Sequence, residues 1–102
     1  MEREQSKVNV HVTYCTPCGG KAAFDEMAAA IQNTIPTATV TGAEDHRSGA
    51  FEVNINGQNV HSRLQTFRYP DVDRAVDVVK NVSLGESVPS SLDWRLTDCA
   101  LS

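Results

Sequence analysis

VNVHVTYCTPCGGKAAFDEMAAAIQNTI, residues 8–35, joins a strand pattern to a helix pattern through a pair of cysteines. Residues 8–14 alternate apolar and polar side chains, which is the period of a strand with one buried face. Residues 21–35 are rich in strong helix formers and carry an apolar stripe at helical spacing. The stretch therefore predicts a strand that leads into a helix, with Cys15 and Cys18 in the loop between them.

The rest of the chain repeats the strand pattern and adds a second helix. A polar loop over 42–49 separates two strand segments, and Asn56-Gly57 favours the tight turn of a β-hairpin. The elements predicted after the first helix are strands over 37–41, 51–55 and 58–64 and a helix over 70–82.

The predicted order is β-α-β-β-β-α, and the two-residue period of the strands limits how these elements pack. Each strand has one apolar and one polar face, and in the fourth strand the polar face carries His61 and Arg63. A sheet covered by helices on both faces shows near-continuous apolar strands instead. We therefore expect a two-layer α+β fold, a mixed four-stranded sheet with two helices on one face and water on the other. The first two strands should be parallel, and the hairpin should add antiparallel strands.

The chain of 102 residues is long enough for one domain with a modest core. Its periodicity begins at Val8 and stops after Leu84. We therefore expect an N-terminal extension over 1–7, a folded domain over 8–84 and a flexible C-terminal tail over 85–102.

Charge and apolar content narrow the class of protein. A net charge of −4, a pI near 5.2 and the lack of a basic run argue against a nucleic-acid partner. No stretch is apolar over the length of a membrane span, and the N-terminus lacks the apolar region of a secretory signal. Three cysteines, an odd number, do not suggest a structural disulfide framework. We therefore expect a monomeric cytoplasmic protein whose cysteines serve chemistry or modification, or are inert.

Cys15 and Cys18 lie where the first predicted strand gives way to the first helix. A loop there should expose the sulfurs, and a helix starting near Cys18 would place the positive end of its dipole beside that sulfur, which favours the thiolate. Lys21 could add a cation on the same helical face. A C-x-x-C pair in this context is typical of thiol–disulfide chemistry, and we expect an intramolecular disulfide under oxidising conditions.

Two other interpretations of the pair stay open from the residues alone. One is a zinc site, which needs about four ligands. The candidates besides the pair are Cys99, His11, His46 and His61. The other is a pair of inert cysteines, although inert cysteines are typically buried. The loop position favours redox chemistry, with no metal and no resident cofactor.

Two segments of the chain resemble the signatures of the selenoprotein W-like (Rdx) family. VTYCTPCGGKAAF is similar to the family's Y-C-x-x-C/selenocysteine-G segment, and SGAFEVNINGQNVHSRL to its G-x-F-E-V stretch and hairpin. The resemblance covers residues 7–82 and implies a thioredoxin-like fold. It also implies that Cys18, at the selenocysteine position of selenoprotein W, attacks and that Cys15 resolves the mixed disulfide. Protein thiols or glutathione would be the reaction partners.

The final residues, Cys99-Ala100-Leu101-Ser102, fit a C-a-a-X prenylation box if Ser102 is the native terminus, and the serine points to farnesyl. The family branch of the migration and invasion enhancer protein also ends in such a box, and the chain resembles that branch more than selenoprotein W. The segment before Cys99 carries no polybasic run. A single lipid therefore predicts reversible attachment to the cytosolic face of membranes.

Two functional hypotheses follow from these observations. The first is a small cytosolic thiol–disulfide oxidoreductase, linked to glutathione and partly held at membranes by its prenylated end. The second is a redox-sensitive signalling adaptor at the cytosolic membrane face, in which the cysteine pair reports redox state to a protein partner. Catalytic turnover separates the two hypotheses.

Overall fold

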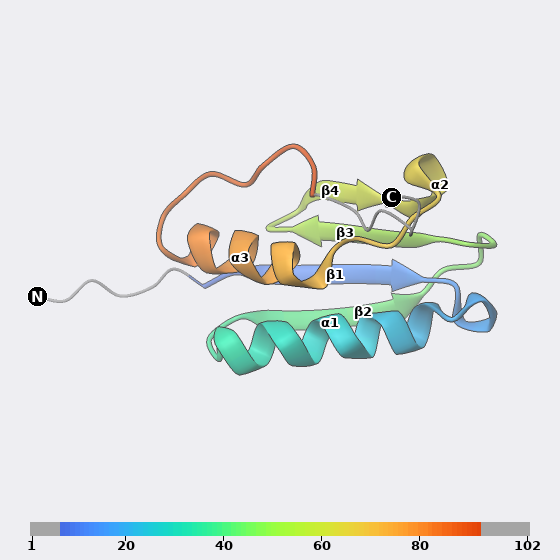
Figure 1. Ribbon diagram of the computed structural model, residues 1–102, viewed down its shortest axis with the longest axis horizontal. Coiled ribbons are helices and arrows are strands. Elements are labelled where there is room, and N and C mark those ends of the chain that lie inside the picture. Colours follow the sequence, from blue (N-terminus) through green and yellow to red (C-terminus); the bar gives the residue numbers. More distant parts are fainter. Residues whose placement is uncertain (1–6, 93–102) are drawn as a thin grey trace, which may run out of the picture.

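A mixed sheet is the centre of the computed structural model, which describes residues 7–92 (Figure 1). In chain order, its four strands are β1 (Asn9–Tyr14), β2 (Thr39–Glu44), β3 (Phe51–Ile55) and β4 (Gln58–Ser62). The strands lie in the spatial order β2-β1-β3-β4. β1 pairs with β2 in parallel and with β3 antiparallel, and β3 pairs with β4 antiparallel. The parallel unit and the hairpin are those that the sequence predicts.

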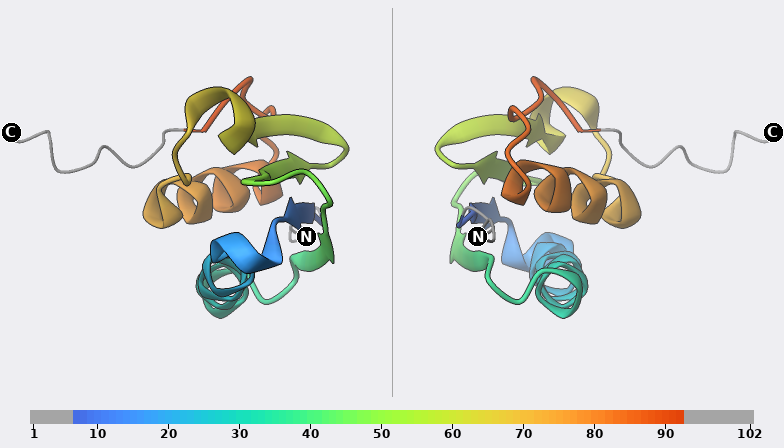
Figure 2. Two further views of the ribbon diagram at one scale, coloured as in Figure 1. Left: turned by 90° about the vertical axis from the view of Figure 1, so that its right-hand side faces the viewer. Right: turned by 90° about the vertical axis from the view of Figure 1, so that its left-hand side faces the viewer.

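Two long helices cover one face of this sheet, as the one-sided strands predict. α1 (Gly20–Thr34) and α3 (Val72–Ser83) lie side by side on that face, whereas none of the helices within residues 7–92 covers the other face (Figure 2). Two short helices, η1 (Thr16–Cys18) and α2 (Arg63–Thr66), lie at the end of the sheet where β1 and β4 finish (Figures 1 and 2). The result is a two-layer α+β fold of the thioredoxin-like kind.

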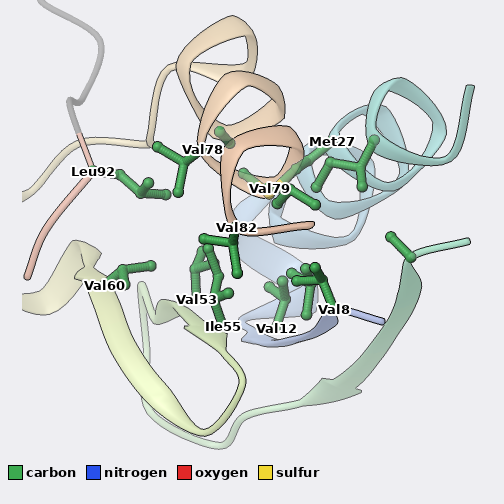
Figure 3. Close-up of a cluster of buried hydrophobic side chains, with 14 of the residues drawn as sticks. Val8, Val12, Met27, Val53, Ile55, Val60, Val78, Val79, Val82 and Leu92 are labelled. Carbon is green, nitrogen blue, oxygen red and sulfur yellow. The ribbon is translucent and has the colours of Figure 1, made fainter. Parts of the chain in front are cut away.

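The core lies between the sheet and the two long helices. Val12 of β1, Ile31 of α1 and Val79 of α3 have no exposed surface, so each layer contributes fully buried side chains. Figure 3 shows valines of the strands facing valines of α3 and Met27 of α1 across this interface. Burial of such side chains is the main favourable contribution to folding, and it fixes which face of each strand points inward.

One residue expected on the polar face of the fourth strand lies in the interior instead. β4 pairs His61 with Val53 and Asn59 with Asn54, which leaves Val60 as the extra residue of a bulge. Val60 and His61 are therefore both buried, and His61 is only 4% exposed. The His61 ring donates its Nε2 proton to the Arg68 carbonyl at 2.7 Å, because that oxygen can only accept. The prediction of an outward His61 was wrong because a bulge shifts the alternation.

β2 begins and ends later than the strand predicted over 37–41. It is an edge strand with mostly exposed side chains, so its backbone pairing with β1 extends through Gly42 to Glu44 without an apolar alternation. Gly42 lies against the Phe24 ring, and a Cβ at this position would be 2.7 Å from Phe24 Cζ. Gly42, which the sequence predicts to start a loop, thus lies within β2 at a point where this strand closely approaches α1.

The chain packs beyond the point where its periodicity stops. Leu92 is 1% exposed, and its amide donates to the Val60 carbonyl at 2.8 Å. Gln58 Nε2 also donates to the Pro89 carbonyl at 3.0 Å, so this segment lies along β4. A single buried leucine in an extended segment produces no periodic pattern in the sequence. The predicted domain therefore ends at residue 84, although packing in the structure continues to Leu92. Residues 1–6 of the predicted extension and residues 93–102 of the predicted tail lie outside the described residues.

Candidate redox site

The backbone around Cys15 ties the cysteine loop to the end of the sheet. The Cys15 amide donates to the Ala50 carbonyl at 2.8 Å, which fixes the residue after β1 against the residue before β3. The Cys15 carbonyl accepts from the amides of Cys18 at 3.3 Å and Gly20 at 3.0 Å. These bonds fold residues 15–20 into a tight turn that brings the second cysteine back toward the first.

Cys15 and Cys18 form a disulfide in the structure, with 5.4 Å between their Cα atoms. This separation lies within the usual range for bridged cysteines. The expectation that the pair lies at disulfide distance is therefore confirmed.

The two cysteines differ sharply in exposure. Cys15 is 4% exposed, whereas Cys18 is an exposed residue on the outer side of η1. An incoming thiol or disulfide therefore meets Cys18 first, and Cys15 is placed to act on Cys18 from the inside. This asymmetry agrees with the roles that the family resemblance implies.

α1 starts at Gly20, close to the start of the helix predicted over 21–35, but Cys18 is not part of its first turn. Cys18 ends the 3-10 turn η1, and Gly19 joins the two helices with a positive φ of 89°. Gly20 is required by a close approach, because a Cβ there would be 2.7 Å from the Cys15 carbonyl oxygen. The Gly-Gly pair thus allows a second helix to begin directly against the cysteine turn.

Lys21 is not directed to the cysteines in the structure. Its ammonium lies 3.1 and 3.0 Å from the two carboxylate oxygens of Asp25, one turn further along α1. This hydrogen bond raises the pKa of Lys21, and the pair is exposed to solvent. The predicted cation beside Cys18 is therefore held by Asp25 instead.

The donor that reaches the Cys18 sulfur comes from the loop before β3. The Gly49 amide donates to Cys18 Sγ at 3.2 Å. A hydrogen bond to a sulfur favours its anionic form. Sequence reasoning missed this residue, although a glycine two positions before a strand is a signal for unusual backbone, and Gly49 has a φ of 82°.

Two further residues missed by sequence reasoning complete the surroundings of Cys18. The Tyr69 hydroxyl donates to the Cys18 carbonyl at 3.2 Å. Arg63 lies with its guanidinium 4.5 Å from the centre of the Tyr69 ring, and its Nη1 donates to the Gly49 carbonyl at 2.9 Å. Side chains from α2 and from the link to α3 thus converge on the second cysteine.

A cavity of about 290 Å³ opens beside the pair on the side of Cys15. Its lining residues come from the cysteine turn and from the end of β2 with the following loop: Cys15, Pro17, Glu44, Asp45, His46 and Ser48. The Arg47 guanidinium lies 2.7 Å from Asp45 and lowers the pKa of that carboxyl. The cavity is large enough for the side chain of a residue next to a reacting cysteine.

The histidines lie in separate places within the described part of the chain. His11 Nδ1 is 2.8 Å from Thr41 Oγ1 on the open face of the sheet, His46 lines the cavity, and His61 is buried at β4. Among residues 7–92, no three histidine, cysteine or acidic side chains are grouped as metal ligands. Cys99, the predicted prenylation site, lies outside the described residues. None of the described helices is long and apolar enough to cross a membrane.

Comparison with known proteins gives relatives in both sequence and structure. The sequence model described as the Rdx family matches residues 9–81. Migration and invasion enhancer 1 of Mus musculus is 35% identical over 90 residues, which cover 88% of this chain and 77% of the relative. The protein of the same name from Bos taurus is 34% identical over 88 residues, covering 86% and 76%.

Two solved structures share the fold. The selenoprotein W-related protein of Vibrio cholerae superposes with a TM-score of 0.65 at 18% identity, over 76% of this chain and 98% of that chain. A protein of Bordetella parapertussis gives a TM-score of 0.63 at 18% identity, over 74% and 96%. At these identities the likeness concerns the fold alone.

Proposed function

This chain belongs to the Rdx family, and from that premise we propose that it is a small thiol–disulfide redox protein acting through Cys15 and Cys18. The observation that carries the proposal is the disulfide between an exposed Cys18 and a buried Cys15, with the Gly49 amide directed at the outer sulfur. An exposed sulfur can form a mixed disulfide with a substrate. A buried neighbouring sulfur can then resolve this mixed disulfide and does not compete for the substrate.

The reaction starts from the reduced protein. The Cys18 thiolate attacks one sulfur of a substrate disulfide, a new S–S bond forms to Cys18, and the first substrate thiolate leaves and takes a proton from water. The Cys15 thiolate then attacks Cys18 Sγ and releases the second substrate thiolate. The protein is left with the Cys15–Cys18 disulfide, and the substrate has gained two electrons.

Glutathione is the reductant that we propose for the return step. One glutathione thiolate attacks Cys18 Sγ and frees Cys15, and a second glutathione displaces the first as glutathione disulfide. Two glutathione molecules thus supply the two electrons. The exposure of Cys18 supports this assignment, because a flexible tripeptide needs an open sulfur.

We further propose that the chain is farnesylated at Cys99 and divides between the cytosol and the cytosolic face of membranes. The support is the sequence Cys99-Ala100-Leu101-Ser102, which is a C-a-a-X box if Ser102 is the native terminus. One lipid chain gives only marginal and reversible membrane binding, so neither location should hold all of the protein. A signalling protein at the membrane would be a natural thiol-bearing partner in this place.

A coupled assay tests the redox proposal. Reduced glutathione, glutathione reductase and NADPH are supplied with a small disulfide, and NADPH consumption is followed. Continued turnover that is lost in Cys18→Ser and kept in Cys99→Ser is the expected result. Consumption of one equivalent per protein, without turnover, would instead support the redox-sensitive adaptor.

A further inference from the structure

Arg63 is held in one place by two contacts at the start of α2. Its Nη1 donates to the Gly49 carbonyl at 2.9 Å, and its guanidinium lies 4.5 Å from the centre of the Tyr69 ring. The Tyr69 ring is supported from another side by Phe51, with 5.2 Å between the ring centres. An arginine stacked on an aromatic ring and hydrogen-bonded at one end has little remaining freedom.

Both partners of Arg63 also hold Cys18. The Gly49 amide donates to Cys18 Sγ at 3.2 Å, and the Tyr69 hydroxyl donates to the Cys18 carbonyl at 3.2 Å. Arg63, Gly49, Cys18 and Tyr69 therefore form a closed ring of contacts. Arg63 lies opposite Cys18 in this ring and does not need to touch it to affect it.

The backbone of Gly49 explains how Arg63 acts on the sulfur. The amide and the carbonyl of Gly49 belong to successive peptide planes, and the relative orientation of these planes is set by φ and ψ of Gly49 together. An anchor on the carbonyl therefore restricts how far both torsions, and with them the amide, can change. Gly49 is a glycine at a φ of 82°, which is the most permissive kind of backbone. Without an anchor on its carbonyl, its amide would lose its fixed direction toward Cys18 Sγ.

Arg63 also carries a feature that stability alone does not explain. Its Nε is buried and has no hydrogen-bond partner among residues 7–92. A buried donor without a partner destabilises a fold, more so when it belongs to a charged group. The presence of an arginine at this position is therefore better explained by the hydrogen bond from its Nη1 to the Gly49 carbonyl, beside the cysteine turn.

Two other cations at this end of the molecule are paired with carboxylates. Lys21 is bound by Asp25 on α1, and Arg47 is bound by Asp45 in the loop after β2. Glu44 and His46 line the cavity on the side of Cys15. The contacts thus link Arg63, rather than Lys21 or Arg47, to the Cys18 side of the disulfide.

We propose that Arg63 is a positioning residue that holds the Gly49 amide and the Tyr69 ring in place and thereby stabilises the Cys18 thiolate. This inference rests on the proposed redox function, for which a stable outer thiolate is needed. Two effects act together: the fixed amide donates to the anion, and the positively charged guanidinium is held against Gly49 and Tyr69, which both contact Cys18.

The test measures the Cys18 thiol directly. In a chain carrying Cys15→Ser and Cys99→Ser, Cys18 is the remaining cysteine, and its alkylation by iodoacetamide is followed across a pH series. Arg63→Gln should raise the midpoint by about one pH unit, which is about a tenfold loss of thiolate at neutral pH. Lys80→Gln removes a cation from the exposed end of α3 and should leave the midpoint unchanged.

Arg63→Lys separates positioning from charge. Lysine keeps the charge but has neither the planar group that stacks on Tyr69 nor the same donor geometry, so the midpoint should stay raised. A midpoint equal to that of the parent in Arg63→Lys or in Arg63→Gln would overturn the proposal. If Arg63→Gln does not fold, Arg63→Lys decides the question alone.

Tyr69→Phe provides an independent arm. It keeps the ring under Arg63 but removes the hydroxyl from the Cys18 carbonyl, and a shift smaller than that of Arg63→Gln is expected. A shift equal to or larger than that of Arg63→Gln would contradict the central place given to Arg63. Alkylation of Cys18 does not depend on turnover. A failure of the proposed redox function in the coupled assay can therefore be distinguished from the absence of a midpoint shift in the Arg63 variants.

Discussion

At the scale of single residues, the redox site depends on how three backbone positions allow Cys18 to face outward. Gly19 takes a positive φ, Gly20 lies too close to the Cys15 carbonyl for any side chain, and Gly49 directs an amide at Cys18 Sγ. The cysteines themselves supply the chemistry, but these glycines decide which sulfur is exposed.

A prediction at this scale concerns His61, whose burial lowers its pKa. Above the unfolded pKa of about 6.5 the ring is neutral in both states and pH has no effect through it. As pH falls below that value, the unfolded chain binds a proton first, and the free energy of unfolding should decrease by up to about 1 kcal/mol near pH 5.5.

Urea unfolding at pH 7.5 and 5.5 measures this effect. The difference between the two pH values should largely disappear in His61→Gln, which can still donate to the Arg68 carbonyl. Asp45, whose pKa is lowered by Arg47, loses its contribution only at more acidic pH and does not interfere in this range. An equal pH dependence in both proteins would show that His61 is not the titrating group.

Sequence reasoning found the cysteine pair but not its neighbours, and the reason is physical. Cys15 and Cys18 lie together in the sequence, so their spacing and the turn between them predict the bridge that the structure contains. Tyr69 is 51 residues from the Cys18 carbonyl that it contacts, and Arg63 and Gly49 meet only after β3 and β4 pair. Polar contacts between distant loops leave no periodic pattern, so they can be known only from the fold.

At the scale of elements, the start of α3 follows Tyr69 closely in the chain and is fixed by a side-chain cap. The Asp71 side chain caps α3 by accepting from the amides of Asp73 at 3.0 Å and Arg74 at 3.4 Å. Such a cap satisfies amides that the first turn of a helix leaves without partners.

Asp71→Ala should therefore lower the free energy of unfolding by about 1 kcal/mol. The matched control is Asp77→Ala, because Asp77 is exposed in the middle of the same helix, where alanine is the better helix former. Denaturant unfolding of the two variants checks the comparison. Equal stability of both variants would show that the cap does not contribute.

The elements were predicted better than their ends. The apolar alternation of β1 and β3 and the stripe of α1 gave the right layers because burial imposes those periods. The extent of β2 and the bulge in β4 escaped prediction, since an edge strand needs only backbone pairing and a bulge breaks the period. The 3-10 turn η1 also escaped prediction, because so short a turn has no distinctive period in the sequence. Cys18 was therefore expected at the start of the long helix.

At the scale of the whole molecule, the segment after α3 packs against β4. Leu92 is the anchor of this segment and is 1% exposed, whereas Leu84 at the end of α3 is 60% exposed. Leu92→Ala should lower the free energy of unfolding by about 2 kcal/mol, since it removes buried side-chain volume.

Leu84→Ala is the control for that change, because the same atoms are removed from a largely exposed side chain. It should alter the free energy of unfolding by less than about 0.5 kcal/mol. Thermal or urea unfolding distinguishes the two. If Leu92→Ala is as mild as Leu84→Ala, the segment along β4 is not part of the stable fold.

The proposed lipid at Cys99 makes a prediction about location. The wild-type protein should divide between membrane and cytosolic fractions of cells, and Cys99→Ser should be found in the cytosolic fraction alone. Its Cys15–Cys18 chemistry should be unchanged, which the coupled assay can verify. An unaltered distribution, together with an unmodified C-terminus by mass spectrometry, would rule out the lipid anchor.

In the proposed mechanism Cys18 attacks and Cys15 resolves, and trapping of the mixed disulfide distinguishes these two roles. In the Cys99→Ser background, reduced proteins are treated with glutathione disulfide and their intact masses are measured. Cys15→Ser should accumulate one glutathione on Cys18, the protein with both cysteines should end as the internal disulfide, and Cys18→Ser should react far more slowly. Faster modification of Cys15 than of Cys18, or a protein that retains both thiols, would contradict the account.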